Sequence, residues 1–170
     1  YIQADEVIHE KYHEAILGAC KEHLGDARVD GLLFDYVHFY GSYDFIGASN
    51  NWYKNEIRII RNSANIYSYR DAQGFRRKNK ALRVKPVYAF MHHYGWVRPP
   101  KTMQAKEESF HRMWHSDEWV SKNVAVAAEF DYTKIDSLSL FKGTHHEVMR
   151  ERIATMNLKF SFDPSRKKLG

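Results

Sequence analysis

The sequence predicts an α/β fold, in which the strands of a sheet are flanked by amphipathic helices. Two observations support this: short, β-prone apolar segments are bounded by turn residues, and two longer segments have apolar residues at helical spacing. With 170 residues, 44% of them hydrophobic and 15% aromatic, the chain is large enough for one domain with a true core. Disordered and fibrous classes are thereby excluded.

The N-terminal segment predicts an acidic strand end that runs into a helix. Residues 1–4 are short and partly apolar, which indicates a buried strand that presents Asp5 and Glu6 at its C-terminal end. A helix is expected over residues 7–24, because apolar side chains recur there at helical spacing and Gly25 follows as a stop. Since the sequence opens on this apolar run without a Met, we expect it to begin inside a longer one.

The remaining elements follow from local composition. Aromatic and β-branched runs predict strands over residues 32–40, 56–61, 66–70 and 84–94, with Pro86 near a bend or edge. The stretch 41–51 is rich in Gly, Ser, Asn and Asp, which is typical of a loop. Pro99 and Pro100 precede a predicted helix over 101–115, and short helices and loops, one helix near 146–156, complete the chain. No linker divides the chain, so we expect one domain or fragment, with a core portion over 1–100 and a helical extension over 101–170.

Charge and cysteine content restrict the classes of partner and compartment. The net charge is +5, but the basic residues are dispersed, so a nucleoside diphosphate explains the excess as well as nucleic acid does. No run of eighteen apolar residues is present, so a transmembrane segment is not expected. The single cysteine, Cys20, has no partner for an internal disulfide and suits a reducing cytoplasm.

Two neighbouring acids and a distant histidine are the candidate metal ligands. In an open α/β sheet ligands bind beyond the carboxyl ends of the strands, where Asp5 and Glu6 are expected. Mg²⁺ and Mn²⁺ take oxygen ligands from one or two carboxylates and share the rest with phosphates and water. His93 stands at the end of the predicted strand 84–94, where a neutral imidazole can complete such a site.

An overlapping motif allows a different metal chemistry. His9-Glu10-Lys11-Tyr12-His13 spells H-E-x-x-H, the pattern of a zinc metallopeptidase that holds zinc between two histidines one helical turn apart. The extended form of the motif is absent, because Ile16 and Ala19 stand where its glycine and third histidine belong. Zinc peptidase therefore stays as an alternative, as does a non-catalytic module that binds carbohydrate or nucleic acid.

The order of these features resembles family 2 and related GT-A glycosyltransferases over roughly residues 1–100. The similarity rests on Gln3-Ala4-Asp5-Glu6, the glycine loop, the strand Arg58-Ile59-Ile60-Arg61, the acid-bearing turn at Asp71, and His93-Tyr94. It implies a GT-A-like mixed sheet flanked by helices that lacks the N-terminal nucleotide-binding βαβ units. In function it implies metal-assisted transfer of a sugar from a nucleotide-diphosphate donor to a hydroxyl of a carbohydrate or lipid-linked acceptor.

The resemblance also implies a role for each matching residue. Asp5 and Glu6, assisted by His93, would hold Mn²⁺ or Mg²⁺ and the donor diphosphate. Asp71 would be the catalytic base, with Asp44 of the glycine loop as the reserve. Three arginines near the turn, Arg58, Arg61 and Arg70, would bind the phosphates of the donor. The family's usual first acid is Gln3 here, so the metal shell would depend on Asp5 and Glu6.

Aromatic side chains complete the expected site. Tyr40, Trp52 and Trp96 would stack on the apolar faces of sugars. Because the nucleotide-binding units are absent from this sequence, the resemblance implies that the chain alone is not a competent enzyme.

Overall fold

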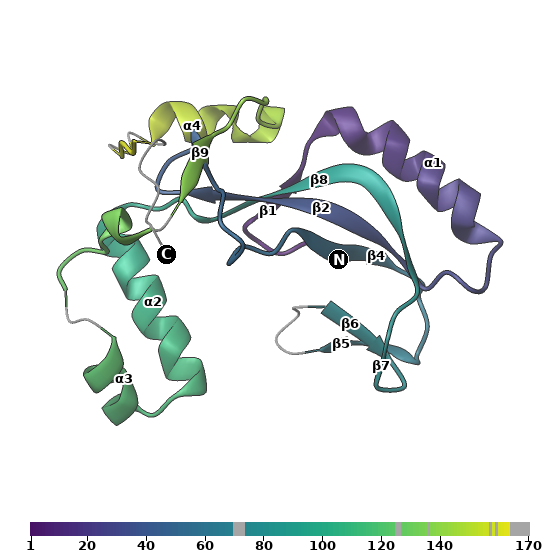
Figure 1. The fold of residues 1–170 in the computed structure, drawn as a ribbon, viewed down its shortest axis with the longest axis horizontal. Coiled ribbons are helices and arrows are strands. Elements are labelled where there is room, and N and C mark those ends of the chain that lie inside the picture. The colour runs from purple at the N-terminus through teal and green to yellow at the C-terminus, as the bar shows by residue number, and fades with distance from the viewer. Residues whose placement is uncertain (70–73, 125–126, 136, 157, 159, 164–170) are drawn as a thin grey trace.

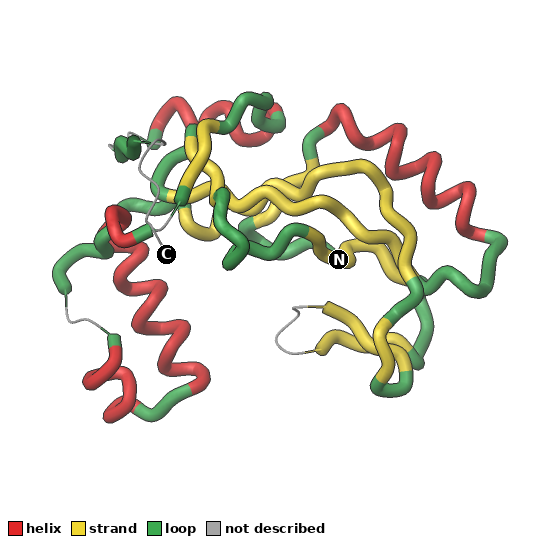
Figure 2. Tube along the Cα trace, viewed as in Figure 1, coloured by secondary structure: helices red, strands yellow, loops and turns green. Residues whose placement is uncertain are grey.

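The computed structural model describes residues 1–69, 74–124, 127–135, 137–156, 158 and 160–163, and its main feature is a six-stranded sheet. The strand order is β1-β8-β2-β3-β9, with β4 paired to β2 beside this path (Figures 1 and 2). Its strands are β1 (Glu6–Ile8), β2 (Gly31–Tyr40), β3 (Phe45–Gly47), β4 (Asn55–Ile60), β8 (Val84–Trp96) and β9 (Leu138–Leu140). A second, three-stranded sheet consists of β5 (Ile66–Tyr69), β6 (Gly74–Arg77) and β7 (Lys80–Ala81).

Four α-helices accompany the sheets in the described part of the chain. They are α1 (His13–Leu24), α2 (Pro100–Trp114), α3 (Asp117–Asn123) and α4 (Arg150–Thr155). Short 3₁₀ turns lie at Glu10–Tyr12, Tyr132–Lys134 and Glu147–Met149. In Figure 1, α1 lies above the main sheet, whereas α2, α3 and the small sheet lie below it. None of the described helices combines the length and the apolar character that crossing a membrane requires.

The main sheet is mixed, which confirms the predicted α/β class and a mixed sheet flanked by helices. The two long strands β2 and β8 run parallel, with His38 opposite His93. Strand β1 pairs antiparallel with β8, and β4 pairs antiparallel with β2. The two parallel strands therefore form the centre, and short antiparallel strands border them.

The N-terminal prediction needs a correction. The expected strand over residues 1–4 does not form; instead β1 begins at the second acid, Glu6, and pairs with β8. The expected helix over 7–24 begins only at His13, because residues 6–8 are extended to pair with β8 and His9 is still extended. Backbone pairing with a strand that is distant in sequence overrides the local helical spacing here.

The other predicted elements lie close to their expected positions. Strands β2, β4, β5 and β8 and helix α2 differ from the predicted bounds by only a residue or two at most ends. Strand β9, within the expected helical extension, joins the main sheet through β3, so this extension also supplies a strand. Strands β3, β6 and β7 are additional to the prediction.

The core lies on both sides of the central strand pair. One buried cluster, Leu32, Phe34, Val87, Ala89 and Met91, is covered by apolar side chains of α1. A second cluster around Phe39 and Tyr94 is covered by residues of the C-terminal segment, among them Ile153. A third cluster around Tyr40 and Met103 attaches α2 to the sheet. The central strands β2 and β8 are thereby fixed on all sides, and residues at their C-terminal ends have a rigid support.

Candidate functional site

The side chains of Asp5, His93 and Lys106 meet at the end of β8. The pairing of β1 with β8 places Glu6 opposite His93, and the Tyr94 amide donates to the Asp5 carbonyl at 2.8 Å. The Asp5 Oδ2 atom then lies 3.6 Å from His93 Nε2 and 3.4 Å from Lys106 Nζ. The structure thus brings together two of the residues predicted to hold a metal, although 88 positions separate them in the sequence.

The neighbours of His93 determine which of its nitrogens carries the proton. His38 Nε2 lies 3.1 Å from the Tyr53 carbonyl oxygen, which only accepts, so this nitrogen of His38 donates. In a neutral His38, Nδ1 is then an acceptor, and it lies 3.1 Å from His93 Nδ1. His93 must therefore donate from Nδ1, and in its neutral form it presents the lone pair of Nε2 to Asp5.

When His93 is neutral, a carboxylate oxygen and an imidazole lone pair face each other. Two such acceptors repel unless a proton or a metal cation lies between them. Asp5 Oδ2 and His93 Nε2 are 3.6 Å apart. This is somewhat wider than the roughly 3 Å between two neighbouring ligand atoms in the octahedral shell of Mg²⁺. When His93 is protonated, its hydrogen bond and positive charge hold the pKa of the Asp5 carboxyl well below its usual value, with a further contribution from Lys106 and against the opposing effect of burial. Asp5 is therefore an anion ready to bind a cation.

Gly95 provides the space for this pair. A β-carbon at this position would lie 2.5 Å from His93 Nε2 and 2.7 Å from Asp5 Oδ2, closer than such atoms approach in proteins. The Gly95 carbonyl also accepts a hydrogen bond from Lys106 Nζ at 2.9 Å. The glycine is consequently required by the close approach of the two side chains to the β8 backbone.

Glu6 has a different role from Asp5. Its carboxylate accepts two hydrogen bonds from the Arg58 guanidinium, at 2.9 and 2.5 Å, and others from the Tyr36 hydroxyl and the Gln3 amide. Burial raises the pKa of Glu6, but these donors outweigh it and leave the pKa below its ordinary value. Because Glu6 side-chain exposure is 0% and both oxygens are bound, this carboxylate is not positioned as a metal ligand.

A pocket of about 270 Å³ opens beside these groups. Its polar lining includes Arg58 and His93, and its aromatic lining includes Trp52 and Trp96; the full lining is Gln3, Tyr36, His38, Asn51, Trp52, Tyr53, Glu56, Arg58, His93 and Trp96. Such a combination of aromatic walls and a few converging polar groups is typical of a small-molecule site.

Glu56 is the described carboxylate that lines this pocket. Burial raises the pKa of Glu56 above its ordinary value, and the nearby Arg58, whose Nη1 lies 3.4 Å away, opposes this effect without cancelling it. A carboxyl group whose pKa is moved toward neutrality is suited to accept and release a proton. Sequence reasoning missed Glu56 because its signal, an acid at the start of a strand, is common on surfaces.

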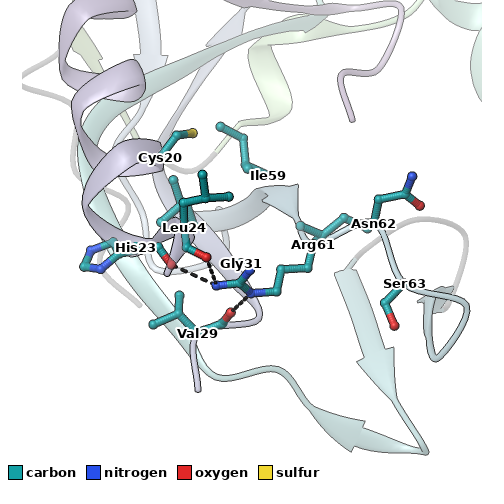
Figure 3. A pocket seen from close by; sticks show the side chains of 11 residues that line it. Cys20, His23, Leu24, Val29, Gly31, Ile59, Arg61, Asn62 and Ser63 are labelled. Carbon is teal, nitrogen blue, oxygen red and sulfur yellow. Dashed lines mark hydrogen bonds between the residues drawn. The ribbon is translucent and has the colours of Figure 1, made fainter. Parts of the chain in front are cut away.

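Arg61 lies away from this pocket, in a structural position. Its guanidinium donates to the backbone carbonyls of Val29, His23 and Leu24, at 2.6 to 3.0 Å (Figure 3), and so binds the C-terminal end of α1. It also donates to the Asp26 carbonyl at 2.7 Å. These contacts border a separate, largely apolar pocket of about 370 Å³ between α1 and β4. The Arg61 guanidinium thus contacts backbone oxygens around the end of α1, so the structure does not bring it to the Asp5–His93 pair.

The two residues predicted as catalytic acids have different outcomes. Asp44 is exposed beyond the end of β2. Its negative charge acts on His145, which packs against Phe39 and Tyr94 and not against Asp5. Asp71 lies outside the described residues, as does Arg70.

The H-E-x-x-H motif does not lie on one helical face. His9 is extended and precedes the 3₁₀ turn, whereas His13 is the first residue of α1. The two nitrogens of His9 are already engaged, Nδ1 with the Lys11 amide at 3.2 Å and Nε2 with Thr144 Oγ1 at 2.8 Å. The geometry that a zinc peptidase requires of this motif is therefore not present.

No group of three or more His, Cys, Asp or Glu side chains is arranged to hold a metal among the residues that the structure describes. Asp5 and His93 therefore provide two ligands at most, in a site that phosphate oxygens and water would complete. Three of the important neighbours, Tyr36, His38 and Lys106, were not predicted, because each depends on contacts across strands or with α2.

The chain matches no protein-family model, no curated protein and no solved structure.

Proposed function

We propose that this chain supplies the metal-binding and acceptor side of a GT-A-type glycosyltransferase, which uses Mn²⁺ or Mg²⁺ to transfer a sugar from a nucleotide-diphosphate donor to an acceptor hydroxyl. One observation carries the proposal: the Asp5 carboxylate and Nε2 of His93 face each other at 3.6 Å beside a partly aromatic pocket. A shared cation relieves their repulsion and leaves positions for a diphosphate.

The charges around the pocket support a role for the metal. Three carboxylates, Asp5, Glu6 and Glu56, outnumber two permanent cations, Arg58 and Lys106. A diphosphate would be repelled by this excess of negative charge, whereas a bound divalent cation would make the net charge of the site positive. When bound, the metal would neutralise the charge that develops on the leaving diphosphate.

The protein's own residues have distinct tasks in this proposal. Asp5 and His93 bind the cation, and His38 fixes the tautomer of His93. Lys106 approaches the same Asp5 oxygen and can also attract the diphosphate. Arg58, proposed from the sequence as a phosphate ligand, acts through its bidentate pair with Glu6, which fixes the N-terminal segment next to the metal ligands.

The proton of the acceptor hydroxyl requires a base. Asp71, which the family resemblance favours, remains the proposed base, with Asp44 as the reserve. Within the described pocket Glu56 offers a further carboxylate, whose raised pKa suits proton transfer near neutral pH. Trp52 and Trp96 supply ring faces next to this carboxylate for a sugar.

Binding of Mn²⁺ is the direct test, measured by the loss of the free-ion electron paramagnetic resonance signal with and without UDP or GDP. We expect binding that strengthens when the diphosphate is present and weakens at least tenfold in Asp5→Asn and in His93→Phe. The control is Asp117→Asn, whose carboxylate is 92% exposed and pairs only with Arg112 on the surface.

The protein that carries this sequence is then assayed for release of nucleoside diphosphate from nucleotide sugars. Mn²⁺ affinity that is identical in the parent and both site variants would remove the proposal. Tight zinc that is lost in His13→Ala would favour the peptidase alternative. Binding to nucleic acid that weakens steeply as salt rises would favour a binding module.

A further inference from the structure

A second hollow lies against α2 and α3, next to the pocket of the proposed donor site. Its volume is about 410 Å³, within the range of small-molecule sites. Partly exposed aromatic rings of Trp96 and Phe130 line one part of it, 6.2 Å apart between ring centroids, and Gln104 and Glu107 of α2 line another. Nothing in the proposed metal chemistry uses this hollow.

The two hollows share a wall of two indole rings. Trp52 and Trp96 line the donor-side pocket, the second hollow and a third one of about 430 Å³. The ring of Trp52 lies against Gly47, where a β-carbon would come within 2.4 Å of the indole nitrogen, so this glycine fixes the wall. A molecule in the second hollow therefore borders the one in the donor-side pocket.

The lining of the second hollow has the chemistry of carbohydrate recognition. Flat, partly apolar ring faces suit the C–H faces of a pyranose, and carboxylate and amide groups accept and donate hydrogen bonds to its hydroxyls. The charged lining contains Glu107, Glu129 and Asp131 against Lys134, which disfavours a second phosphate-bearing ligand. The ligand class is accordingly a neutral or amino sugar.

We infer that this hollow binds the sugar acceptor, with Trp96 and Phe130 as its stacking surface and Glu107 as a hydroxyl-binding group. The inference rests on the proposed function, and it adds the substrate class and the location of the acceptor. Because both hollows border Trp52 and Trp96, a hydroxyl of an acceptor bound in the second hollow would lie next to the donor sugar. The other sugar rings of the acceptor would lie between β8 and α2.

Saturation-transfer NMR with methyl glycosides of glucose, galactose, mannose, glucosamine and N-acetylglucosamine tests the inference. We expect at least one glycoside to bind, and Phe130→Leu and Glu107→Gln each to weaken its binding by about three- to tenfold. Leucine keeps apolar volume beside Tyr132, and Gln at position 107 keeps the size of the partly exposed Glu107 and an oxygen that can face His111, so both variants should fold. The matched control is Glu118→Gln, on the exposed side of α3, where the carboxylate pairs with Lys122.

Mn²⁺ and UDP or GDP binding are measured on the same variants and separate the two proposals. Glycoside binding that depends on Phe130 and Glu107 supports the inference even if no nucleoside diphosphate binds, in which case the proposed function fails alone. Nucleotide binding without any glycoside binding overturns the inference alone. Glycoside binding that both variants leave unchanged also overturns it, because the sugar then binds elsewhere.

Discussion

His93 and His38 share one hydrogen bond through their Nδ1 atoms, at 3.1 Å, and in a neutral His93 this bond places the lone pair of the other nitrogen toward Asp5. The bond connects two parallel strands, since the residues are opposite each other in β2 and β8. In the proposed site, His38 does not touch the cation, but it determines whether Nε2 of His93 can bind the cation together with Asp5. This second layer of contacts is typical of metal-binding histidines.

Removing the His38 acceptor should weaken metal binding. In His38→Phe the Nδ1 proton of His93 loses its partner, so we expect Mn²⁺ affinity to fall by about 10- to 100-fold. Long-range ¹⁵N NMR of His93 should show the Nδ1–H tautomer in the parent protein and a mixture of tautomers in the variant. In His38→Gln the amide oxygen can accept the same proton, and part of the affinity should return. Equal affinities in all three proteins would contradict this role of His38.

A methyl group at Gly95 should separate the ligand pair. We expect Gly95→Ala to displace His93 or Asp5 and to lower Mn²⁺ affinity at least tenfold, because the new β-carbon overlaps both side chains. Gly18→Ala is the matched control, since a β-carbon there meets nothing within 4 Å in helix α1. That variant should gain about 0.5–1 kcal/mol in free energy of unfolding, with Mn²⁺ binding unchanged. Titration with Mn²⁺ and urea denaturation measure the two effects.

Breaking the buried pair of Glu6 and Arg58 should reduce stability rather than metal affinity per folded molecule. Glu6→Gln leaves the guanidinium, 3% exposed, without its bidentate anion and with only the longer, 3.4 Å contact to Glu56, and we expect a loss of about 3–5 kcal/mol in free energy of unfolding. Glu118→Gln removes an exposed pair and should cost less than about 1 kcal/mol. Urea denaturation gives both values, and Mn²⁺ titration of the folded fraction tests the ligand role. A stable Glu6→Gln protein that no longer binds Mn²⁺ would reassign Glu6 as a ligand.

Acid should destabilise the fold through two buried histidines. Burial first, and then the charge of neighbouring histidines, lower the pKa of His38 to about 4 and that of His92 to about 3. In the unfolded chain both have pKa values near 6.5, so the unfolded state binds more protons below that pH. The stabilisation is complete above pH 7 and is lost as the pH falls from about 6.5 toward 4, by about 2–3 kcal/mol for each histidine.

Urea denaturation at pH 7.5, 5.5 and 4.5 measures this loss. The decrease should be smaller in His92→Phe, which keeps an aromatic ring beside Phe39 and cannot be protonated. The same free energy of unfolding at all three pH values would contradict the buried, neutral state of both rings.

Sequence periodicity was sufficient to predict a strand or helix where that element depends on its own residues. The aromatic run of β2, the strand of β4 and the helix after Pro99-Pro100 were predicted within a residue or two at most ends, because alternation, helical spacing and proline act locally. Pairing decided the N-terminal region instead: residues 6–8 became a strand because β8 lay beside them, and the predicted helix lost its first turns.

The sequence by itself determined the chemical groups of the site, but Asp5 reaches His93 through the antiparallel pairing of β1 with β8 and not from the end of the strand expected over residues 1–4. Only the tertiary structure separated the two adjacent acids, because Arg58, 52 residues from Glu6, and Tyr36 neutralise one while the other faces an imidazole. It also decided that Arg61 binds a helix end and that His38 sets a tautomer. These roles depend on hydrogen bonds between distant segments, and no local pattern of residues specifies them.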